Sequence, residues 1–548
     1  MELDDAVLTP QERLSFALRR LYEGAGFRHY RMGRFEEYRL YQENRRFLAS
    51  DQVITFTDLD GRLLALKPDV TLSIAKNARV EPGTCGRFWY HENVYRPGRE
   101  SHGFREIAQM GLECVGDVDG ADTAQVLSLA AQSLAAAGRP WILEVGHMGF
   151  AAGLFDAVGT PEDVRFRLLR FLRDRKYHAL ADLVRETGTG DWEAVNALPD
   201  LSGDWETVLQ KAEKLVRNEA MAGAIRELRE LGSALTRSDT AGELRLDLSL
   251  VNNMDYYNGL VFQGFLEGLP RPVLRGGQYD PLAARFHPDS RAVGFALYLD
   301  ELERQEEGGI TLTGGARDSE RAGASGETPP PQTSKTSGES DRRVLSIALP
   351  KGRLGDQVLG LLARAGYGTV EDYGRKLVVE NFAAGIRYFL VKPSDVHVYV
   401  ERGAADIGIA GLDTLEEHRA DVYELLDTGL GKCRMCVAAP EGFTDNPERT
   451  LRVATKFVRI AKSHFSAQGR SIDIIKLHGS IELAPLLGLS DVIVDIVETG
   501  TTLRENGLRV VEEFLPVSAR LIANRSSFQF RRREITDLCE KLREVTDA

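Results

Sequence analysis

Two carboxylates and three threonines surround a single glycine in the stretch 495–503, and these residue types suit a phosphorylated sugar. A glycine lets the backbone approach a phosphate closely, and the N–H groups of a turn that opens a helix supply a positive field. Threonine hydroxyls add donors, while carboxylates accept from ribose hydroxyls or bind magnesium. The residues predicted to bind a phosphorylated ribose are Asp495, Glu498, Thr499, Gly500, Thr501 and Thr502. An ordinary strand–turn–helix corner with a threonine cap is the alternative.

Basic side chains follow the apolar strands in the C-terminal part of the chain. Lys351 and Arg353 come after one predicted strand, Lys392 after another and Lys456 after a third. The polar segment 476–482 lies just before the phosphate loop. Each of these alone would be ordinary surface charge. Together they predict a cationic set opposite the loop, which a pair of polyphosphate substrates requires.

Length and charge exclude several classes of protein. At 548 residues the chain is too long for one core, so roughly two to four domains are expected. The net charge of −13 argues against a general nucleic-acid binder, because such proteins carry a basic face. No apolar run has the length of a membrane span, and the acidic start of the chain lacks the pattern of a signal peptide. We predict a cytoplasmic protein with no nucleic-acid or membrane partner.

A segment poor in large apolar residues divides the chain. Residues 306–341 are dominated by Gly, Ser, Thr, Pro and charge, so they cannot bury enough surface to fold and are predicted to form a flexible linker. They separate residues 1–305 from residues 342–548. After the linker, strands alternate with helical patterns, which predicts an α/β fold with ligands at the strand ends. Before it, strands rich in Arg and aromatic residues predict an α+β fold on an antiparallel sheet, with a helical insert at 148–241.

The predicted strands are short. Those before the linker lie at 54–57, 63–66, 86–95, 107–115, 244–250 and 259–265, and those after it at 344–349, 386–390, 407–410, 435–439, 452–455, 472–477 and 492–497. Cys433 and Cys436 belong to one strand and should face opposite sides of it. No second Cys pair or nearby His completes a zinc site, so both are interpreted as packing residues.

Four segments follow one another in a recognisable order in residues 342–548. They are Ala348–Leu354, Tyr399–Asp413, Lys476–Asp491 and Asp495–Leu503. In this order they closely resemble ATP phosphoribosyltransferase, and the resemblance covers nearly all of this part. It implies two α/β lobes, like those of a periplasmic binding protein, with the site between them. It also implies transfer of phosphoribosyl from phosphoribosyl pyrophosphate to N1 of ATP with release of pyrophosphate, the first step of histidine biosynthesis.

The resemblance assigns roles to these residues. It places the 5′-phosphate and ribose in the loop 495–502 and implies Mg²⁺ as cofactor, with Asp495 as a protein ligand. The implied catalytic set is Lys351, Arg353, Lys456 and Glu482, and the implied ATP-binding set is Lys392, Asp413, Gly479 and Ser480. Lys351 and Arg353 would hold pyrophosphate or the ATP phosphates. Lys392 departs from the Arg expected there, which keeps the charge but loses the bidentate fork.

Motifs in the N-terminal part resemble a class II synthetase of the histidyl type. Arg87–Arg96 with Gly103–Glu113 is similar to its motif 2, and Ala292–Leu302 to its motif 3. Two cations are replaced, because Glu301 and Asn252 stand where the family carries Arg, and this should disable adenylate formation. Most of the amino-acid pocket is retained, at Asp69, Thr71, Arg96, Gln109, Glu113, Tyr257 and Tyr279.

The C-terminal part resembles the short form of ATP phosphoribosyltransferase, which relies on a separate regulatory subunit related to histidyl-tRNA synthetase. The chain therefore resembles a natural fusion of the two, in which L-histidine bound in the N-terminal part would inhibit the C-terminal part. A homo-oligomer is expected, and a tetramer of the fused chain would match the four-plus-four octamers of short-form systems.

Three alternatives stay open. The first is that the retained pocket residues are relics of the fold in a decayed domain. The second is that the chain is a working histidyl-tRNA synthetase with an appended domain, which Glu301, Asn252 and the lack of a clear anticodon-binding domain oppose. The third is that the C-terminal part is a solute-binding module, although such a module has no need of the loop Thr499–Thr502.

Overall fold

The structure of the chain is a computed structural model. It describes residues 8–48, 52–81, 83–98, 103–187, 192–235, 244–252, 256–303, 344–368, 376–381 and 384–546. The predicted linker, 306–341, lies outside these residues. Within the described ranges, no helix is both long enough and apolar enough to cross a bilayer.

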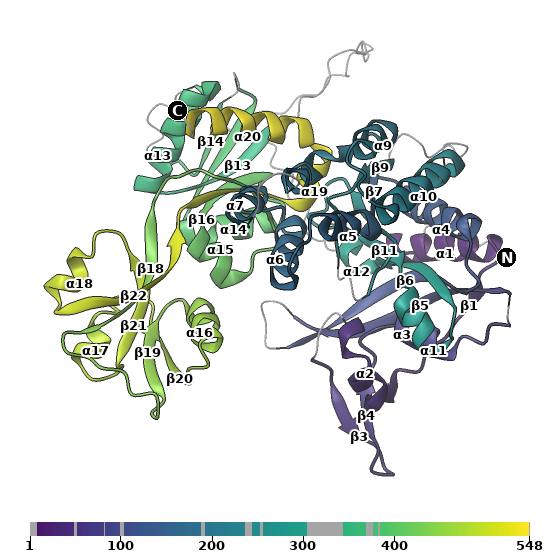
Figure 1. Cartoon of the computed structure of the whole chain (residues 1–548), viewed down its shortest axis with the longest axis horizontal. Helices are drawn as coiled ribbons and strands as arrows, with labels where there is room; N and C mark the ends of the chain where they lie inside the picture. The colour runs from purple at the N-terminus through teal and green to yellow at the C-terminus, as the bar shows by residue number, and fades with distance from the viewer. Residues whose placement is uncertain are drawn as a thin grey trace, which may run out of the picture.

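A nine-stranded sheet forms the core of the N-terminal half (Figure 1). Neighbouring strands are antiparallel except for two parallel pairs, β1 with β5 and β7 with β9, so the predicted antiparallel sheet is present. Across the sheet the strands are β1 (Arg28–His29), β5 (Cys85–Pro97), β6 (Phe104–Gly116), β12 (Arg291–Tyr298), β11 (Leu274–Gln278), β10 (Leu260–Leu266), β7 (Trp141–His147), β9 (Leu244–Asp247) and β8 (Ser202–Gly203). A separate three-stranded sheet contains β2 (Phe35–Glu37), β4 (Leu63–Leu66) and β3 (Thr55–Thr57).

Helices cover the nine-stranded sheet. The first helix begins at the predicted cap, where Thr9 accepts from the Glu12 N–H and the Glu12 carboxylate accepts from the Thr9 N–H. Helices α4 and α5 pack on β10, while α3 packs on β6 and α11 on β12. The helices of this half are α1 (Pro10–Gly24), α2 (Tyr38–Glu43), α3 (Thr71–Asn77), α4 (Gly120–Ala135), α5 (Met148–Ala157), α6 (Glu162–Arg173), α7 (Tyr177–Thr187), α8 (Glu193–Asn196), α9 (Trp205–Glu213), α10 (Glu219–Leu235), α11 (Asp280–Phe286) and α12 (Leu299–Glu303). The predicted helical insert is therefore present as α5 to α10.

The first sheet of the C-terminal half has six strands and defines a first lobe. In order they are β14 (Val378–Asn381), β15 (Ile386–Val391), β13 (Leu345–Pro350), β16 (Ile407–Gly411), β23 (Ala519–Ala523) and β17 (Tyr423–Asp427). Its helices are α13 (Arg353–Leu362), α14 (Val396–Glu401), α15 (Leu412–His418), α19 (Arg525–Phe530) and α20 (Arg532–Thr546). The pairs that β13 makes with β15 and β16 are parallel, and the pairs of β14, β17 and β23 are antiparallel.

A five-stranded sheet defines the second lobe. In order its strands are β20 (Ile472–Lys476), β19 (Leu451–Thr455), β21 (Val492–Val497), β18 (Cys433–Pro440) and β22 (Leu508–Val517), and its helices are α16 (Val458–Ala467), α17 (Leu483–Leu486) and α18 (Thr501–Glu505). The pairs of β19 with β20 and β21 are parallel, whereas β18 pairs antiparallel with β21 and β22. The predicted α/β alternation is present, on mixed sheets.

The chain passes between the two lobes twice. It leaves the first lobe after β17, through residues 428–432, and it returns from β22 to β23 through Ser518. Figure 1 shows the second lobe carried on β18 and β22. The hydroxyl of Ser518 donates to Asp427 Oδ1 at 2.8 Å, so a hydrogen bond ties the two crossings together. We call these two crossings, residues 428–432 and Ser518, the hinge of the C-terminal half.

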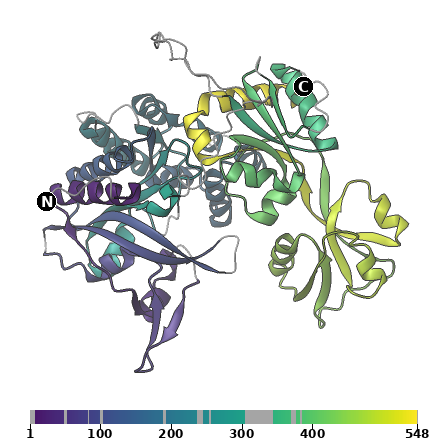
Figure 2. The same cartoon turned by 180° about the vertical axis from the view of Figure 1, so that it is seen from behind.

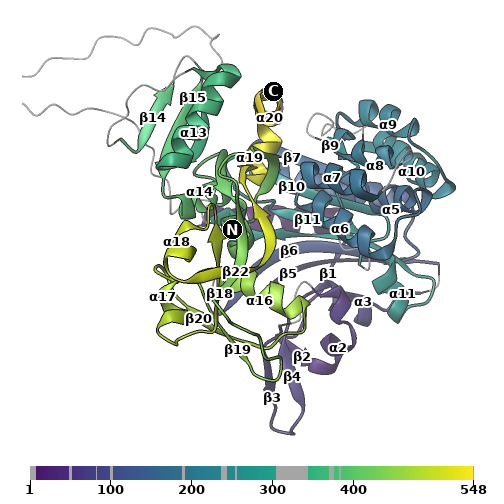
Figure 3. The same ribbon diagram turned by 60° about the vertical axis from the view of Figure 1, so that its left-hand side comes forward.

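The two halves are in contact, with α6 and α7 lying beside the first lobe (Figures 1 and 3). Helix α7 packs on β17, and α19 packs on β10; from behind, α19 and α20 are seen beside the N-terminal half (Figure 2). Arg175 is buried at this contact. Its guanidinium donates to Asp247 at 2.5 Å within its own half and lies 4.9 Å from the centre of the Tyr423 ring in the first lobe. The side chain of Arg175 is therefore enclosed by residues of both halves.

Candidate functional site

The predicted phosphate loop joins β21 to α18, in the predicted order of strand, turn and helix. Gly500 has a φ of +72°, a left-handed conformation that glycine adopts without strain. The hydroxyls of Thr499 and Thr501 lie 3.1 Å apart, and Glu498, Thr499, Thr501 and Thr502 are all exposed. Helix α18 has only 5 residues, so the turn amides and hydroxyls carry more of the positive field than a helix dipole does.

Arg504 adds a cation to this loop and was not among the predicted residues. Its Nη1 donates to the Thr499 carbonyl at 3.2 Å, and its Nη2 donates to the Thr501 hydroxyl at 3.3 Å. The guanidinium therefore links Thr499 to Thr501 and stabilises the turn. The available signal was its position four residues after the glycine, where a helix brings a side chain back to its first turn.

Three charged residues of the predicted set, Lys456, Glu482 and Asp413, surround Asp495. Lys456 Nζ lies 3.8 Å from Asp495 Oδ1. Burial raises the pKa of Asp495, Lys456 lowers it, and Glu482 and Asp413 raise it. Burial also raises the pKa of Asp413, which Lys456 lowers. Asp413 comes from the first lobe and the others from the second, so the structure brings these predicted residues together across the two lobes.

Arg353 makes a second contact between the lobes. It opens α13, directly after Gly352 with its φ of +88°, and its Nη2 donates to Glu498 Oε2 at 2.5 Å. Both side chains are more than half exposed, at 75% and 55%, so an anionic ligand can reach the guanidinium. Lys351 is also exposed, at the carboxyl end of β13. The first-lobe cations thus stand opposite the phosphate loop of the second lobe.

The remaining predicted nucleotide residues are less closely tied to this cluster. Lys392 is exposed after β15, and Gly479 and Ser480 are exposed between β20 and α17. Ser480 has a φ of +48°, which is uncommon for a residue with a side chain and is enriched at functional sites. Within the described residues, no ion pair joins Lys392 to the other predicted side chains.

Cys433 lies closer to the site than its interpretation as a packing residue implies. Burial, together with the charges of Asp413 and Glu498, raises the pKa of its thiol to about 11. Cys436, on the same strand, is buried. Cys436 is buried in the second lobe, as its interpretation as a packing residue expects, whereas Cys433 is half-buried beside the carboxylates that meet across the lobes.

Glu113 is the centre of the predicted set in the N-terminal half. Thr71 Oγ1 donates to its Oε1 at 2.7 Å, and Tyr279 OH donates to its Oε2 at 2.6 Å. The side chain is buried, and this burial raises its pKa to about 8. A Cβ added at Gly294 would lie 1.7 Å from the carboxylate, so glycine there leaves room for the acid.

The other predicted pocket residues surround this carboxylate. Arg96 Nη2 lies 3.4 Å from Asp69 Oδ2, and burial raises the pKa of Asp69 while Arg96 lowers it. Gln109 lies on the same face of β6 as Glu113, because the two are four positions apart and side chains alternate along a strand. Gln109 is 2% exposed, and its Nε2 has no hydrogen-bond partner among the described residues. An unpartnered buried amide invites a ligand, since leaving it unsatisfied is costly.

Aromatic rings complete the pocket. The rings of Tyr256 and Tyr257 lie 4.5 Å apart, and those of Tyr256 and Tyr279 lie 5.8 Å apart. A Cβ at Gly277 would meet the Tyr257 ring at 2.6 Å, so this ring rests directly on the sheet backbone. The structure therefore brings six of the seven predicted pocket residues together around Glu113 and Asp69, and Gln109 lies four positions before Glu113 on β6.

The motif 3 departure is also visible. Glu301 adjoins Asp300 in α12, and burial followed by the charge of Glu301 raises the pKa of Asp300 to about 6. Arg105 Nη2 lies 3.5 Å from Asp300. Negative charge thus dominates the place where the family resemblance requires a cation for ATP. The side chain of Asn252, the other replaced cation, is exposed.

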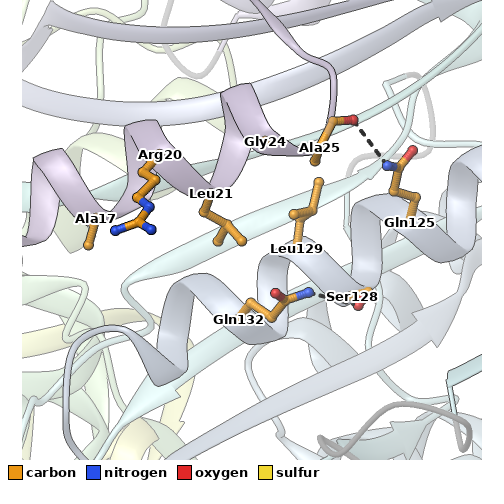
Figure 4. Close-up of a pocket in the computed structure, with 9 residues that line it drawn as sticks. All are labelled: Ala17, Arg20, Leu21, Gly24, Ala25, Gln125, Ser128, Leu129 and Gln132. Atoms are coloured by element: carbon orange, nitrogen blue, oxygen red, sulfur yellow. Dashed lines mark hydrogen bonds between the residues drawn. The ribbon is translucent and has the colours of Figure 1, made fainter.

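A hollow between α1 and α4 belongs to neither set (Figure 4). It is lined by Ala17, Arg20, Leu21, Gly24, Ala25, Gln125, Ser128, Leu129 and Gln132. Gln125 donates to the Ala25 carbonyl and Gln132 to the Ser128 hydroxyl, so both amides are used within the hollow. With one cation and no carboxylate, it offers little chemistry.

Comparison with known proteins matches each half to a family. Residues 392–544 match the family model described as ATP phosphoribosyltransferase, and residues 2–302 match the model described as histidyl-tRNA synthetase. An ATP phosphoribosyltransferase from Brachyspira hyodysenteriae is 54% identical over 205 residues, which are 37% of this chain and 100% of that protein. One from Caldanaerobacter subterraneus is 50% identical over 204 residues, 37% of this chain and 97% of that protein.

A solved structure shows the same likeness in sequence. The ATP phosphoribosyl transferase (HisG:HisZ) complex from Thermotoga maritima contains a chain that is 36% identical, with 37% of this chain and 98% of that chain covered and a TM-score of 0.34. The histidyl-tRNA synthetase model covers more than half of this chain, and the relatives named above are covered over nearly their whole length. The chain therefore belongs to the ATP phosphoribosyltransferase family, joined in one polypeptide to an N-terminal half of the histidyl-tRNA synthetase family.

Proposed function

We propose that the C-terminal half transfers phosphoribosyl from phosphoribosyl pyrophosphate to N1 of ATP, between two lobes like those of a periplasmic binding protein. In this reaction the C1′–O bond to pyrophosphate breaks as a bond from adenine N1 to C1′ forms. The observation that carries the proposal is the contact between Arg353 of the first lobe and Glu498 of the second. It brings the first-lobe cations to the loop that suits a phosphorylated ribose.

The chain's own residues would act mainly by position and charge. The turn amides and hydroxyls of Thr499–Thr502 would hold the 5′-phosphate, and Asp495 with Glu498 would accept from the ribose hydroxyls. Lys351, Arg353 and Lys456 would stabilise the charge that develops on the leaving pyrophosphate. Glu482 with Asp413 and Ser480, and with Lys392 and Gly479 at the rim, would orient the nucleotide. Adenine N1 is already a nucleophile, so alignment matters more than a general base.

The residues fit Mg²⁺ as the cofactor of this site. Magnesium takes oxygen ligands and is commonly held by one or two carboxylates together with substrate phosphates. Asp495 and Glu498 offer carboxylates on the edge of the phosphate loop, and Asp495 is only 20% exposed. When bound, the ion would neutralise charge on the pyrophosphate. Lys456 lies beside Asp495 and Arg353 beside Glu498, so both cations would be within reach of substrate phosphates at this edge of the loop.

The test is formation of phosphoribosyl-ATP and pyrophosphate from the two substrates with Mg²⁺. The full chain should produce both in equal amounts. Binding of either substrate by a folded chain that makes neither product would instead favour a solute-binding role.

We also propose that the N-terminal half binds L-histidine and inhibits the C-terminal half. The buried Gln109 amide and the Glu113 and Asp69 carboxylates would take the amino acid's charged groups, and Tyr257 with Tyr279 would enclose its imidazole. Calorimetry with L-histidine tests the binding, and the titration of turnover tests the inhibition. Tyr257→Ala with Glu113→Ala should abolish both, and persistence of inhibition in that variant would remove the sensor assignment.

A histidyl-tRNA synthetase activity is disfavoured by Glu301 and its neighbour Asp300, which repel ATP phosphates. An exchange assay between ATP and pyrophosphate with histidine should give no signal. We further propose a homo-oligomer of the fused chain, with four copies as the first expectation. Light scattering with size-exclusion chromatography measures that number directly.

A further inference from the structure

Lys176 lies in the contact between the halves, immediately before α7, and touches the first lobe twice. Its Nζ is 2.8 Å from Glu424 Oε2 and 3.1 Å from Glu416 Oε1. The Lys176 side chain is 13% exposed and that of Glu424 5%, so this pair is largely withdrawn from water. Withdrawal strengthens the attraction, and losing one partner would leave a buried charge alone. Lys176 is therefore a strong anchor of the N-terminal half on the first lobe.

The first of these contacts leads to the hinge. Burial raises the pKa of Glu424, but His178 and Lys176 lower it to about 2, so Glu424 is ionised. On its other side, Arg520 Nε lies 3.5 Å from Glu424, and Arg520 Nη1 pairs with Asp427. Asp427 is the last residue before one crossing and is hydrogen-bonded to Ser518 in the other. A series of charged contacts therefore leads from Lys176 to residues at both crossings, Asp427 and Ser518.

The second contact leads to the interface between the lobes. Glu416 is followed in α15 by Glu417, whose carboxylate accepts from the N–H groups of Arg459 at 3.0 Å and Ile460 at 3.1 Å. These N–H groups open α16 of the second lobe, where a negative charge is favourable. Neighbouring residues of one first-lobe helix therefore hold the N-terminal half and the second lobe.

We propose that Lys176 is a positioning residue through which the N-terminal half sets the angle between the two catalytic lobes. It touches no substrate site. It holds β17 beside the hinge and α15 beside the lobe contact, so a shift of the N-terminal half moves both. Opening the lobes would separate Arg353 from Glu498 and so disperse the site. The signal for such a shift, histidine binding, rests on the regulation proposed above, whereas the mechanical link does not.

The decisive variants are Lys176→Met, which removes the positive charge, and Lys176→Arg, which keeps it. Arg170→Ala is the matched control, because Arg170 also faces Glu416, at 3.5 Å, but is 48% exposed and lies at the edge of the contact. Lys176→Met should bind histidine as the wild type does by calorimetry, yet at saturating histidine it should keep on the order of ten times more turnover than the wild type keeps. Lys176→Arg and Arg170→Ala should stay within about twofold of the wild type.

Hydrogen exchange gives a readout that does not depend on activity. Without any ligand, Lys176→Met should exchange faster at 428–432 and at the start of α16, while the β10 and β11 strands stay as in the wild type. Unchanged exchange at both places, or inhibition at saturating histidine as complete as in the wild type, overturns the proposal. A wild-type chain that neither binds histidine nor is inhibited by it refutes the proposed regulation instead, and the exchange result still decides the role of Lys176.

Discussion

Arg353 and Glu498 meet at 2.5 Å although 145 positions separate them in the chain and each belongs to a different lobe. Because both side chains are exposed, the pair contributes little to stability. Its value lies in placing a planar guanidinium, with its fork of donors, directly beside the turn Thr499–Thr502. In the proposed function, the pair marks where the two lobes meet around the substrates.

Replacing Arg353 should therefore impair turnover and leave the fold intact. Arg353→Gln removes a charged donor from the leaving pyrophosphate, and we expect kcat/KM for phosphoribosyl pyrophosphate to fall by about 10²-fold. Steady-state kinetics with varied phosphoribosyl pyrophosphate measures the loss. Arg387→Gln, which breaks an ion pair with Glu380 at the sheet edge of the same lobe, is the control and should retain activity.

The threonine hydroxyls of the phosphate loop give a second prediction. Thr501→Val with Thr502→Val keeps the shape of the turn but removes two donors, and these side chains are exposed, so the fold should tolerate the change. Turnover should fall by at least about 10²-fold, as expected when donors to a phosphate are lost. Thr444→Val, at another exposed site of the second lobe, should be silent. Equal activity in both variants would exclude a role of the hydroxyls.

Glu113 predicts a pH dependence of stability. Its pKa is raised from 4.5 to about 8 in the folded chain, so the folded state keeps a proton that the unfolded chain has lost. The contribution of Glu113 to stability is therefore complete below pH 4.5 and is lost as the pH rises through about 8. Glu113→Gln should flatten the fall of the melting temperature between about pH 5 and about pH 8.5. Calorimetric melting of both proteins across this range tests it, and parallel pH profiles would contradict the raised pKa.

Arg175 predicts the strength of the contact between the halves. Removing one member of a buried charged cluster commonly costs about 3–5 kcal/mol, because its partners are left unpaired. Arg175→Met should lower the melting temperature and, after proteolytic cleavage within the predicted linker 306–341, let the halves separate on size-exclusion chromatography. Arg173→Met is the control, since Arg173 is 56% exposed and pairs with its neighbour Asp174. Halves that co-elute after cleavage of the Arg175 variant would show that other contacts suffice.

The strands and the phosphate loop could be predicted because their signals are local. Apart from Asp495, the run Val492–Val497 is apolar and β-branched, and the glycine at 500 favours a turn after it, so strand, turn and helix follow. By contrast β22 alternates exposed and half-buried residues and carries charges, and β23 is separated from it by Ser518 alone. The antiparallel strands β22 and β23 were therefore not predicted, whereas the antiparallel β18 was, as 435–439.

The site was predictable where the residues lie in recognisable motifs, and its supporting contacts were not. Arg504 and Cys433 reach the site through the geometry of a turn and a ladder, which composition does not encode. Arg175 and Lys176 look like ordinary members of a polar helical stretch. Only the packing of β17 against α7 shows that the first lobe buries them.

The two crossings at 428–432 and Ser518 have a mechanical consequence. A rigid body tethered at two points keeps one rotational degree of freedom, about the line through those points. The second lobe is held in this way, so its movement relative to the first reduces to a single angle. Every ligand that spans the lobes must act on that one coordinate. ATP and phosphoribosyl pyrophosphate should therefore bind with positive cooperativity, each lowering the dissociation constant of the other by the same factor.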